Sequence, residues 1–156
     1  MVDANQIEAI VKKVKECATK VYEELGGGWN ETIYQKAMEV ALRTINLPYE
    51  TQRILPITYS GFVVGESIPD LVVWVEEKSR RTGIVIDLKW ESGIKEEHSS
   101  QVMKYIQELK KQVKGNESVY PNGYVINFTK NATSVKVSEE MLESSGGVQI
   151  LEVNHK

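Results

Sequence analysis

Apolar residues recur every three or four positions along the first part of the chain, which is typical of amphipathic helices. This spacing predicts a helix over about residues 4–25, which ends at Gly26-Gly27-Gly28 because glycine terminates helices. A second helix is predicted from Asn30, a suitable N-cap, to between Asn46 and Pro48. Its inward positions would be Tyr34, Met38, Ala41 and Ile45, and its outward positions Gln35, Lys36, Glu39 and Arg43.

Between Tyr49 and Lys89 the pattern changes to β-branched and aromatic residues. Turn signals at Ser60-Gly61, Gly65 and residues 78–83 predict three or four consecutive strands in a meander. A third helix is predicted over about His98–Val113, with an apolar stripe of Val102, Ile106, Leu109 and Val113. The remaining predictions are a strand at 123–128, a turn at 129–132, a strand at 134–138, a short helix at 139–143 and a strand at 148–153.

This order of elements predicts an α+β or mixed α/β sandwich fold. A length of 156 residues, of which 41% are hydrophobic and 26% charged, suits one domain over residues 1–156. No run approaches the about 18 apolar residues of a membrane span, and the first residues carry charges where a signal peptide is apolar. We therefore expect a cytoplasmic protein. The single cysteine, Cys17, excludes an internal disulfide and suits a packing position.

The net charge of −3 does not by itself indicate a nucleic-acid partner, since phosphate binding relies on Lys and Arg. Two local clusters offer the necessary cations, or else form ordinary solvated helix faces. They are Lys12, Lys13, Lys15 and Lys20 on the first helix, and Lys104, Lys110, Lys111 and Lys114 on the third.

The segment most informative about chemistry runs from Ile84 to Trp90. In a strand, Asp87 and Lys89 share one face, while Ile84, Ile86 and Leu88 share the other. If the strand that follows Asp70 pairs with this one, the two aspartates approach each other, and a divalent cation would relieve their repulsion. Lys89 would then hold or deprotonate the attacking water, or stabilise charge on the phosphate. Alternatively, Asp70 only begins a strand, and Asp87 with Lys89 is a weak exposed ion pair.

Four further positions lie on predicted helices that could reach the same region. Glu31 shares the inward face of Tyr34, although a first-turn glutamate also complements the helix dipole. Gln101 and Tyr105 are four residues apart beside the apolar stripe, where they could bind a phosphate or only flank the stripe. His98 would cap the helix or contact substrate.

Four motifs in order resemble the PD-(D/E)xK nuclease superfamily and, within it, the GxxExxY protein family. The GxxExxY motif extends from Gly28 to Tyr34, and the PD motif is Pro69-Asp70. The third motif is Asp87-Leu88-Lys89, where the family more often has glutamate first, and the fourth extends from Gln101 to Tyr105. The segment that ends in Asn127-Phe128 also resembles a strand of this family.

The resemblance implies a restriction-endonuclease-like fold, in which a central mixed sheet is flanked by helices. It also implies a nuclease that requires Mg²⁺ or Mn²⁺. Asp70, Asp87 and the backbone carbonyl of Leu88 would bind the metal, Glu31 would act on a metal or its water, and Lys89 would be the catalytic lysine. Tyr34, His98, Gln101 and Tyr105 would contact the substrate. The fourth motif resembles that of enzymes that process DNA ends or single strands, so DNA is the expected substrate.

Two alternatives to a nuclease stay open at this point. One is a catalytically silent module that binds nucleic acid or a protein in the same groove, although clustered carboxylates repel phosphate. The other is a purely structural α/β protein with exposed acids. A second copy of the chain, or a separate nuclease or helicase subunit, would be the protein partner.

Overall fold

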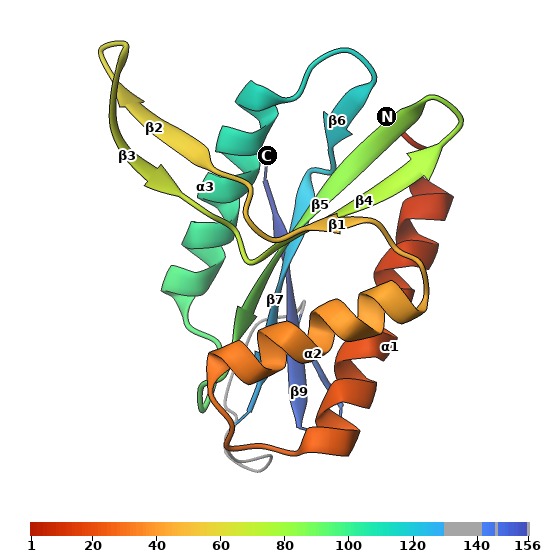
Figure 1. Ribbon diagram of the computed structural model, residues 1–156. Coiled ribbons are helices and arrows are strands. Elements are labelled where there is room, and N and C mark those ends of the chain that lie inside the picture. Colours follow the sequence, from red (N-terminus) through yellow and green to blue (C-terminus); the bar gives the residue numbers. More distant parts are fainter. Residues whose placement is uncertain (130–141, 146, 156) are drawn as a thin grey trace.

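The computed structural model describes residues 1–129, 142–145 and 147–155 (Figure 1). The three helices are α1 (Ala4–Leu25), α2 (Glu31–Thr44) and α3 (Glu96–Gln112). The strands are β1 (Tyr49–Glu50), β2 (Leu55–Tyr59), β3 (Phe62–Ser67), β4 (Leu71–Glu77), β5 (Arg80–Lys89), β6 (Glu117–Val119), β7 (Asn122–Phe128), β8 (Leu142–Ser145) and β9 (Val148–Asn154).

Most of the strands form one mixed sheet in the order β1-β4-β5-β7-β9-β8, with β6 paired to β5. The β5–β7 and β5–β6 pairs are parallel, and the other neighbours are antiparallel. A parallel pair needs a crossover connection, and α3 supplies it between β5 and β7. The predicted mixed sheet flanked by helices is therefore confirmed.

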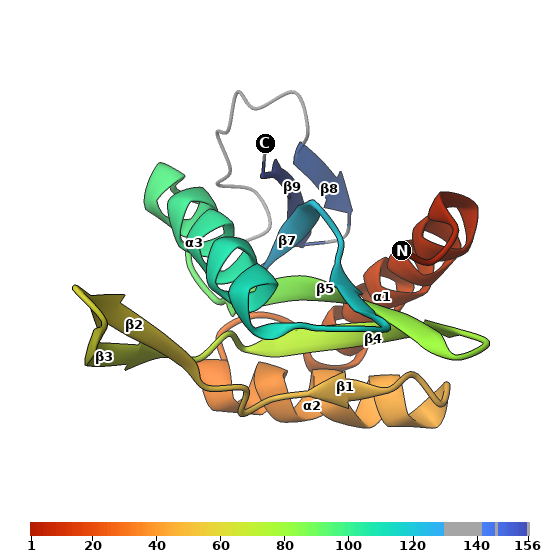
Figure 2. The same cartoon turned by 90° about the horizontal axis from the view of Figure 1, so that it is seen from above.

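Helices cover both faces of this sheet (Figure 2). One core cluster joins α1 and α2 to the face that carries Ile84, Ile86 and Leu88 of β5. The other joins α3 to the opposite face, which carries Val85. Because β5 is apolar on both faces, it reads in the sequence as a nearly continuous apolar run.

The helix ends follow from local side-chain hydrogen bonds. Asp3 accepts a hydrogen bond from the backbone N–H of Asn5, and Asn30 accepts one from that of Ile33, so both act as N-caps. At Gly26, φ is +71°, a left-handed conformation that favours glycine after a helix. No helix in the described ranges is long and apolar enough to cross a membrane.

Several sequence predictions about the strands are wrong. The segment from Tyr49 to Lys89 is not a simple meander, because β1 pairs with β4 while β2 and β3 form a separate two-stranded sheet. Gly65 lies within β3 rather than in a turn, and β5 already begins at Arg80. Short strand β6 has no counterpart among the predicted elements.

Two helix predictions also need correction. Ile45 is 39% exposed because α2 ends at Thr44, and Leu42 takes its place in the core. Residues 142 and 143 belong to β8, so the predicted short helix is wrong there. Its other residues, the predicted strand at 134–138 and the turn after Thr129 lie outside the described residues.

The close approach of α3 to β7 depends on Gly123. A Cβ atom on this residue would lie 2.6 Å from Cγ1 of Val102 and 3.0 Å from the backbone oxygen of Val85. We predict that Gly123→Ala lowers the free energy of unfolding by about 1–3 kcal/mol, because the packed side chains must shift. Urea denaturation measures the change. Gly65→Ala is the matched control, since nothing lies within 4 Å of its Cβ position, and an equal loss in both variants would contradict the packing argument.

Candidate active site

Asp87 and Lys89 lie at the carboxyl end of β5 and point toward the α3 side of the sheet. Asp87 is only 2% exposed, and Nζ of Lys89 lies 3.3 Å from its Oδ2. The predicted alternation along β5 is therefore confirmed, and Val85 lies on the same face as Asp87 and Lys89. This ion pair is not the weak, exposed pair of the alternative interpretation.

Asp70 is brought to Asp87 by the pairing of β4 with β5. The ladder begins at Leu71 opposite Ile86, so the same register places Asp70 opposite Asp87. Directly opposed residues of an antiparallel pair share a face, and the two carboxyl groups lie within hydrogen-bonding reach. Oδ2 of Asp70 also accepts a hydrogen bond of 2.7 Å from the backbone N–H of Leu88, which fixes its position.

The backbone of Leu88 adds an oxygen at the same place. In an extended strand the N–H and C=O of one residue point to the same side, so the carbonyl of Leu88 also faces the β4 side. The register places Pro69 opposite Leu88, and proline has no N–H to donate. Asp70 thus supplies a carboxylate, and Pro69 cannot donate a backbone hydrogen bond to the carbonyl of Leu88.

The ionisable side chains at this end of the sheet shift one another's pKa values. Burial, followed by the hydrogen bond and charge of Asp70, raises the pKa of Asp87 to about 8, although Lys89 opposes the shift. Burial lowers the pKa of Lys89, but the carboxylates of Asp87, Asp70 and Glu31 outweigh it and raise the pKa overall. Lys89 is therefore an ammonium ion at neutral pH.

Glu31 approaches from the opposite side of the sheet, at the first turn of α2. Burial and the charges of Asp70 and Glu91 raise its pKa, while Lys89 lowers it. Glu31 and Asp70 line one hollow of about 360 Å³ between α2 and the loop before β4. The structure thus brings Glu31 to Asp70 and Lys89, as the sequence predicted.

Tyr105 and Gln101 of α3 line a second hollow, of about 590 Å³, together with Lys89. Burial and then the charges of Asp87, Asp70 and Glu31 raise the pKa of Tyr105 to about 12. Its hydroxyl is therefore a hydrogen-bond donor directed at an acidic region. Both residues lie beside Lys89, as the spacing of their motif predicted.

His98 acts as a helix cap. Its Nδ1 accepts a hydrogen bond from the backbone N–H of Lys95, and its Nε2 lies 2.9 Å from Oε2 of Glu91. Burial lowers the pKa of His98, although Glu91 opposes the shift, so a neutral ring with its proton on Nε2 satisfies both contacts. The predicted capping role is confirmed.

Asn127 and Glu91 are positioning residues whose contacts sequence reasoning missed, although the family resemblance included Asn127. The fully buried side chain of Asn127 bonds both backbone groups of Glu91, accepting from its N–H at 2.8 Å and donating to its C=O at 3.0 Å. The Glu91 carboxylate then contacts Lys95 and His98 at the start of α3. Partial burial opposes ionisation of Glu91, but Lys95, His98 and Lys89 lower its pKa. The one available signal was a buried asparagine within the apolar GYVINF segment.

Tyr34 differs from the other predicted site residues. It is 1% exposed, its ring stacks on Phe128 at 4.6 Å between centroids, and its hydroxyl donates to the backbone oxygen of Gly26. These contacts pack α2 on the sheet and hold the loop before it. They give the predicted substrate contact of Tyr34 no support.

The oxygen ligands at this end of the sheet fit a hard divalent cation. Oδ2 of Asp87 is buried and lacks a well-formed hydrogen bond, despite its ion pair with Lys89. In the described part of the chain, no three acidic, histidine or cysteine side chains are grouped closely enough to enclose a metal. A metal here would thus use two carboxylates, a backbone carbonyl and water, and Mg²⁺ commonly retains several waters.

Comparison with known proteins agrees with this geometry. A family model described as the PD-(D/E)XK nuclease superfamily matches residues 8–139, which is most of the chain. The chain therefore belongs to the PD-(D/E)XK nuclease superfamily. Its members are generally nucleases, and they typically use divalent metals and act on nucleic acid. The comparison with curated proteins gives no match, and neither does the comparison with solved structures.

The raised pKa of Asp87 predicts a pH-dependent stability for the metal-free protein. The folded state keeps a proton that the unfolded chain releases near pH 4, so the free energy of unfolding falls as pH rises from about 4 to about 8. Because asparagine does not ionise, Asp87→Asn removes this decrease in the free energy of unfolding. The variant should therefore have a free energy of unfolding at about pH 9 that is higher than that of the wild type by at least about 1 kcal/mol. Urea denaturation in the presence of a chelator, at about pH 5 and about pH 9, measures the free energy of unfolding of both proteins.

Glu76→Gln is the control for this prediction, because Glu76 is an exposed acid toward the other end of the β4–β5 pair. Wild-type and Asp87→Asn proteins that lose equal stability between the two pH values would show that Asp87 is ordinarily ionised.

Proposed function

We propose that the protein is a Mg²⁺- or Mn²⁺-dependent nuclease that hydrolyses phosphodiester bonds of DNA. The observation that carries the proposal is the buried pair of Asp70 and Asp87 with Lys89 beside it, at the end of β5. Membership of the PD-(D/E)XK superfamily supports it independently. The four motifs in order favour the GxxExxY family within that superfamily.

The residues that would hold the metal are Asp70, Asp87 and the carbonyl of Leu88, with Glu31 acting on a metal or its water. A bound Mg²⁺ or Mn²⁺ would supply positive charge to the phosphodiester oxygens and lower the pKa of an attacking water. The carboxylates repel a phosphate when no cation is present. Substrate binding at this site should therefore require the metal.

Lys89 would act as a fixed positive charge beside the reacting phosphate. Its raised pKa favours this role over that of a general base, because the ammonium form has no lone pair to accept a proton. Asp87 holds the ammonium group at 3.3 Å, so its position is set before substrate binds. Tyr105 and Gln101 face the same hollow and can donate hydrogen bonds to phosphate oxygens.

Substitution of the central residues tests the proposal. Asp87→Asn and Lys89→Ala should each reduce metal-dependent cleavage by at least about 100-fold, since each removes charge stabilisation from the reacting centre. Cleavage of labelled single-stranded and duplex DNA, and of RNA, is measured in Mg²⁺ and in Mn²⁺. Circular dichroism establishes that the variants are folded.

Arg80→Ala is the matched control, because Arg80 lies at the opposite end of β5 from Lys89 and pairs with Glu77 at 2.7 Å. It should cleave like the wild type. A folded wild-type protein that cleaves no nucleic acid in either metal would contradict the proposal. In that case, nucleic-acid binding unaffected by a chelator and by loss of Asp87 would indicate a binding module instead.

A further inference from the structure

The hairpin formed by β2 and β3 projects from the body of the protein beside α3 (Figures 1 and 2). Among the described residues its strands pair only with each other, and Ser60 and Gly61 form its two-residue turn with φ of +50° and +83°. Tyr59 and Phe62 flank this turn as a cross-strand pair and are 73% and 74% exposed. Such large exposed rings on a projecting hairpin indicate a binding surface.

The register places both rings on the face that leads to the candidate active site. Leu55, Ile57 and Tyr59 alternate along β2 and therefore share a face, and Phe62 lies opposite Tyr59. Leu55 is fully buried in the core with α3, and Ile57 lines the hollow that contains Lys89. By the alternation along β2, the rings of Tyr59 and Phe62 lie on the same face as Ile57, farther from the hollow and beyond a register shift between Ile57 and Thr58.

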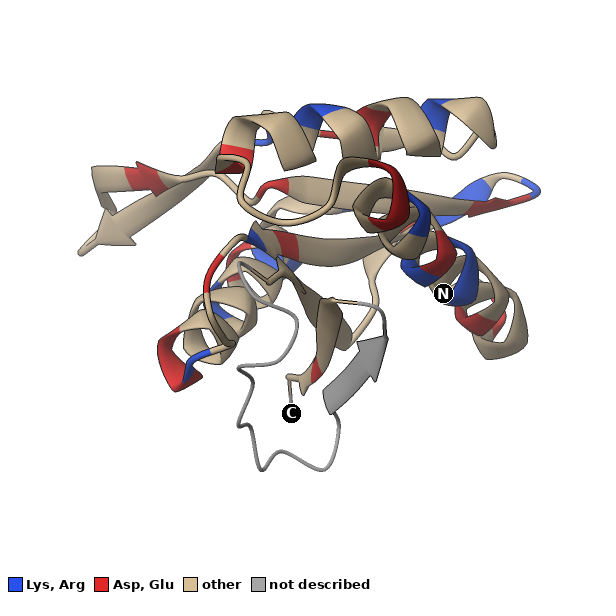
Figure 3. Ribbon diagram, turned by 90° about the horizontal axis from the view of Figure 1, so that it is seen from below, with Lys and Arg blue, Asp and Glu red and all other residues tan. Residues whose placement is uncertain are grey.

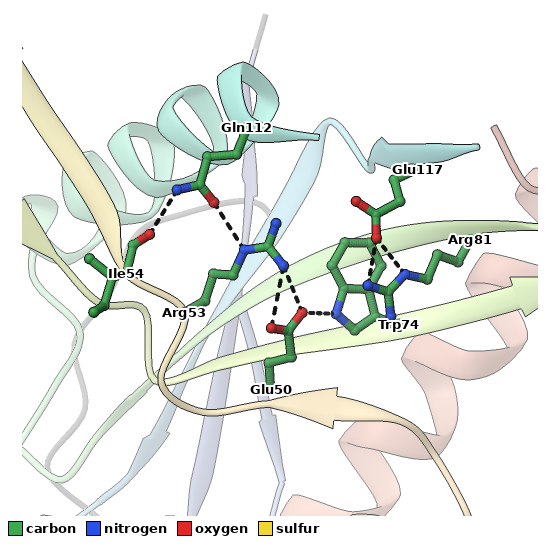
Figure 4. Close-up of polar contacts among 7 residues, drawn as sticks. All are labelled: Glu50, Arg53, Ile54, Trp74, Arg81, Gln112 and Glu117. Atoms are coloured by element: carbon green, nitrogen blue, oxygen red, sulfur yellow. Dashed lines mark hydrogen bonds and ion pairs between the residues drawn. The ribbon is translucent and has the colours of Figure 1, made fainter. Parts of the chain in front are cut away.

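The base of the hairpin is fixed by a network of polar contacts (Figure 4). Gln112 of α3 donates to the backbone oxygen of Ile54 at 2.8 Å and accepts from Nε of Arg53 at 3.0 Å. Arg53 also pairs with Glu50, which accepts a hydrogen bond from the indole of Trp74. The base of the hairpin is therefore attached to α3 and to β4 by specific contacts.

The charges of the two walls differ. Residues 54–68 contain no lysine or arginine and only one acid, Glu66, so the hairpin offers no cationic side chain to a phosphate (Figure 3). The α3 wall carries Lys104, which forms no ion pair within the described part of the chain, near Lys89. It also carries two acids, Glu97, which is exposed, and Glu108, which pairs with Lys111 at 2.9 Å. One wall thus suits flat apolar groups, and the other suits a phosphate.

We propose that this groove binds unpaired nucleotides of the substrate, with bases stacked on Tyr59 and Phe62 and phosphates directed toward Lys104. Aromatic rings accept any base by stacking, but only where the base is not already enclosed in a duplex. The substrate class is therefore single-stranded nucleic acid or a strand with an unpaired end. This inference rests on the proposed nuclease function, because it assigns the route by which a strand reaches Lys89.

The test compares hairpin variants in a Lys89→Ala background, so that bound DNA stays intact. Fluorescence anisotropy with Mg²⁺ measures binding of labelled oligothymidylate and of a blunt-ended duplex. Tyr59→Ala/Phe62→Ala should weaken oligothymidylate binding by about 10-fold or more. Tyr59→Leu/Phe62→Leu should weaken it similarly, because it keeps apolar area but removes the aromatic faces. Tyr59→Phe/Phe62→Tyr keeps both rings and should bind like the parent.

Thr58→Ala/Val63→Ala is the matched control, since this neighbouring cross-strand pair lies on the opposite face of the hairpin. It should leave binding unchanged. With Lys89 restored, Tyr59→Ala/Phe62→Ala should raise the KM for single strands and change kcat little.

Each contrary result has a distinct meaning. If the wild type cleaves nucleic acid but the ring variants bind single strands normally, the inference is overturned and the proposed function stands. If light scattering finds a dimer that Tyr59→Leu/Phe62→Leu retains and the alanine variant loses, without any change in DNA binding, the hairpin docks a second copy instead. A wild type that neither binds nor cleaves nucleic acid overturns both.

Discussion

The structure depends on holding together, at the end of a buried strand, two carboxyl groups that repel each other when both are ionised. Asp87 would be unfavourable in this position unless a cation were close, and Lys89 supplies only part of the compensation. The surrounding contacts preserve this arrangement: Leu88 fixes Asp70 through its N–H, and Asn127 fixes the chain just beyond Lys89. A site of this kind lowers the stability of the empty protein in return for affinity for a divalent cation.

Local sequence patterns were sufficient to predict most of the three long helices and the placement of Asp70 and Asp87 beside Lys89. Helix α1 begins and ends where the apolar spacing and the glycines indicated, and Asn30 caps α2 as expected. The alternation around Asp87 also predicted which side chains share a face, because strand geometry has a fixed period of two residues. These features depend on residues that are near one another in the sequence.

Features that depend on distant residues could not be predicted in this way. Nothing near Tyr49 indicates that it pairs with Val73, so the strands of this region were assigned to a meander. The contacts of Asn127 with Glu91 join segments 36 residues apart, and their role becomes visible only when β5 and β7 are adjacent. Tyr34 shows the opposite error, since a motif residue that suggested substrate binding is a buried packing residue.

The central claim is that Asp70, Asp87 and the carbonyl of Leu88 together hold a divalent cation next to Lys89. Anomalous X-ray diffraction from a crystal soaked in Mn²⁺ tests it most directly. An anomalous peak between the two carboxylates, within about 2.0–2.3 Å of an oxygen of each and of the Leu88 carbonyl, is the predicted result. A crystal saturated with Mn²⁺ that shows no ion there, or one bound only to other acids, would contradict the account.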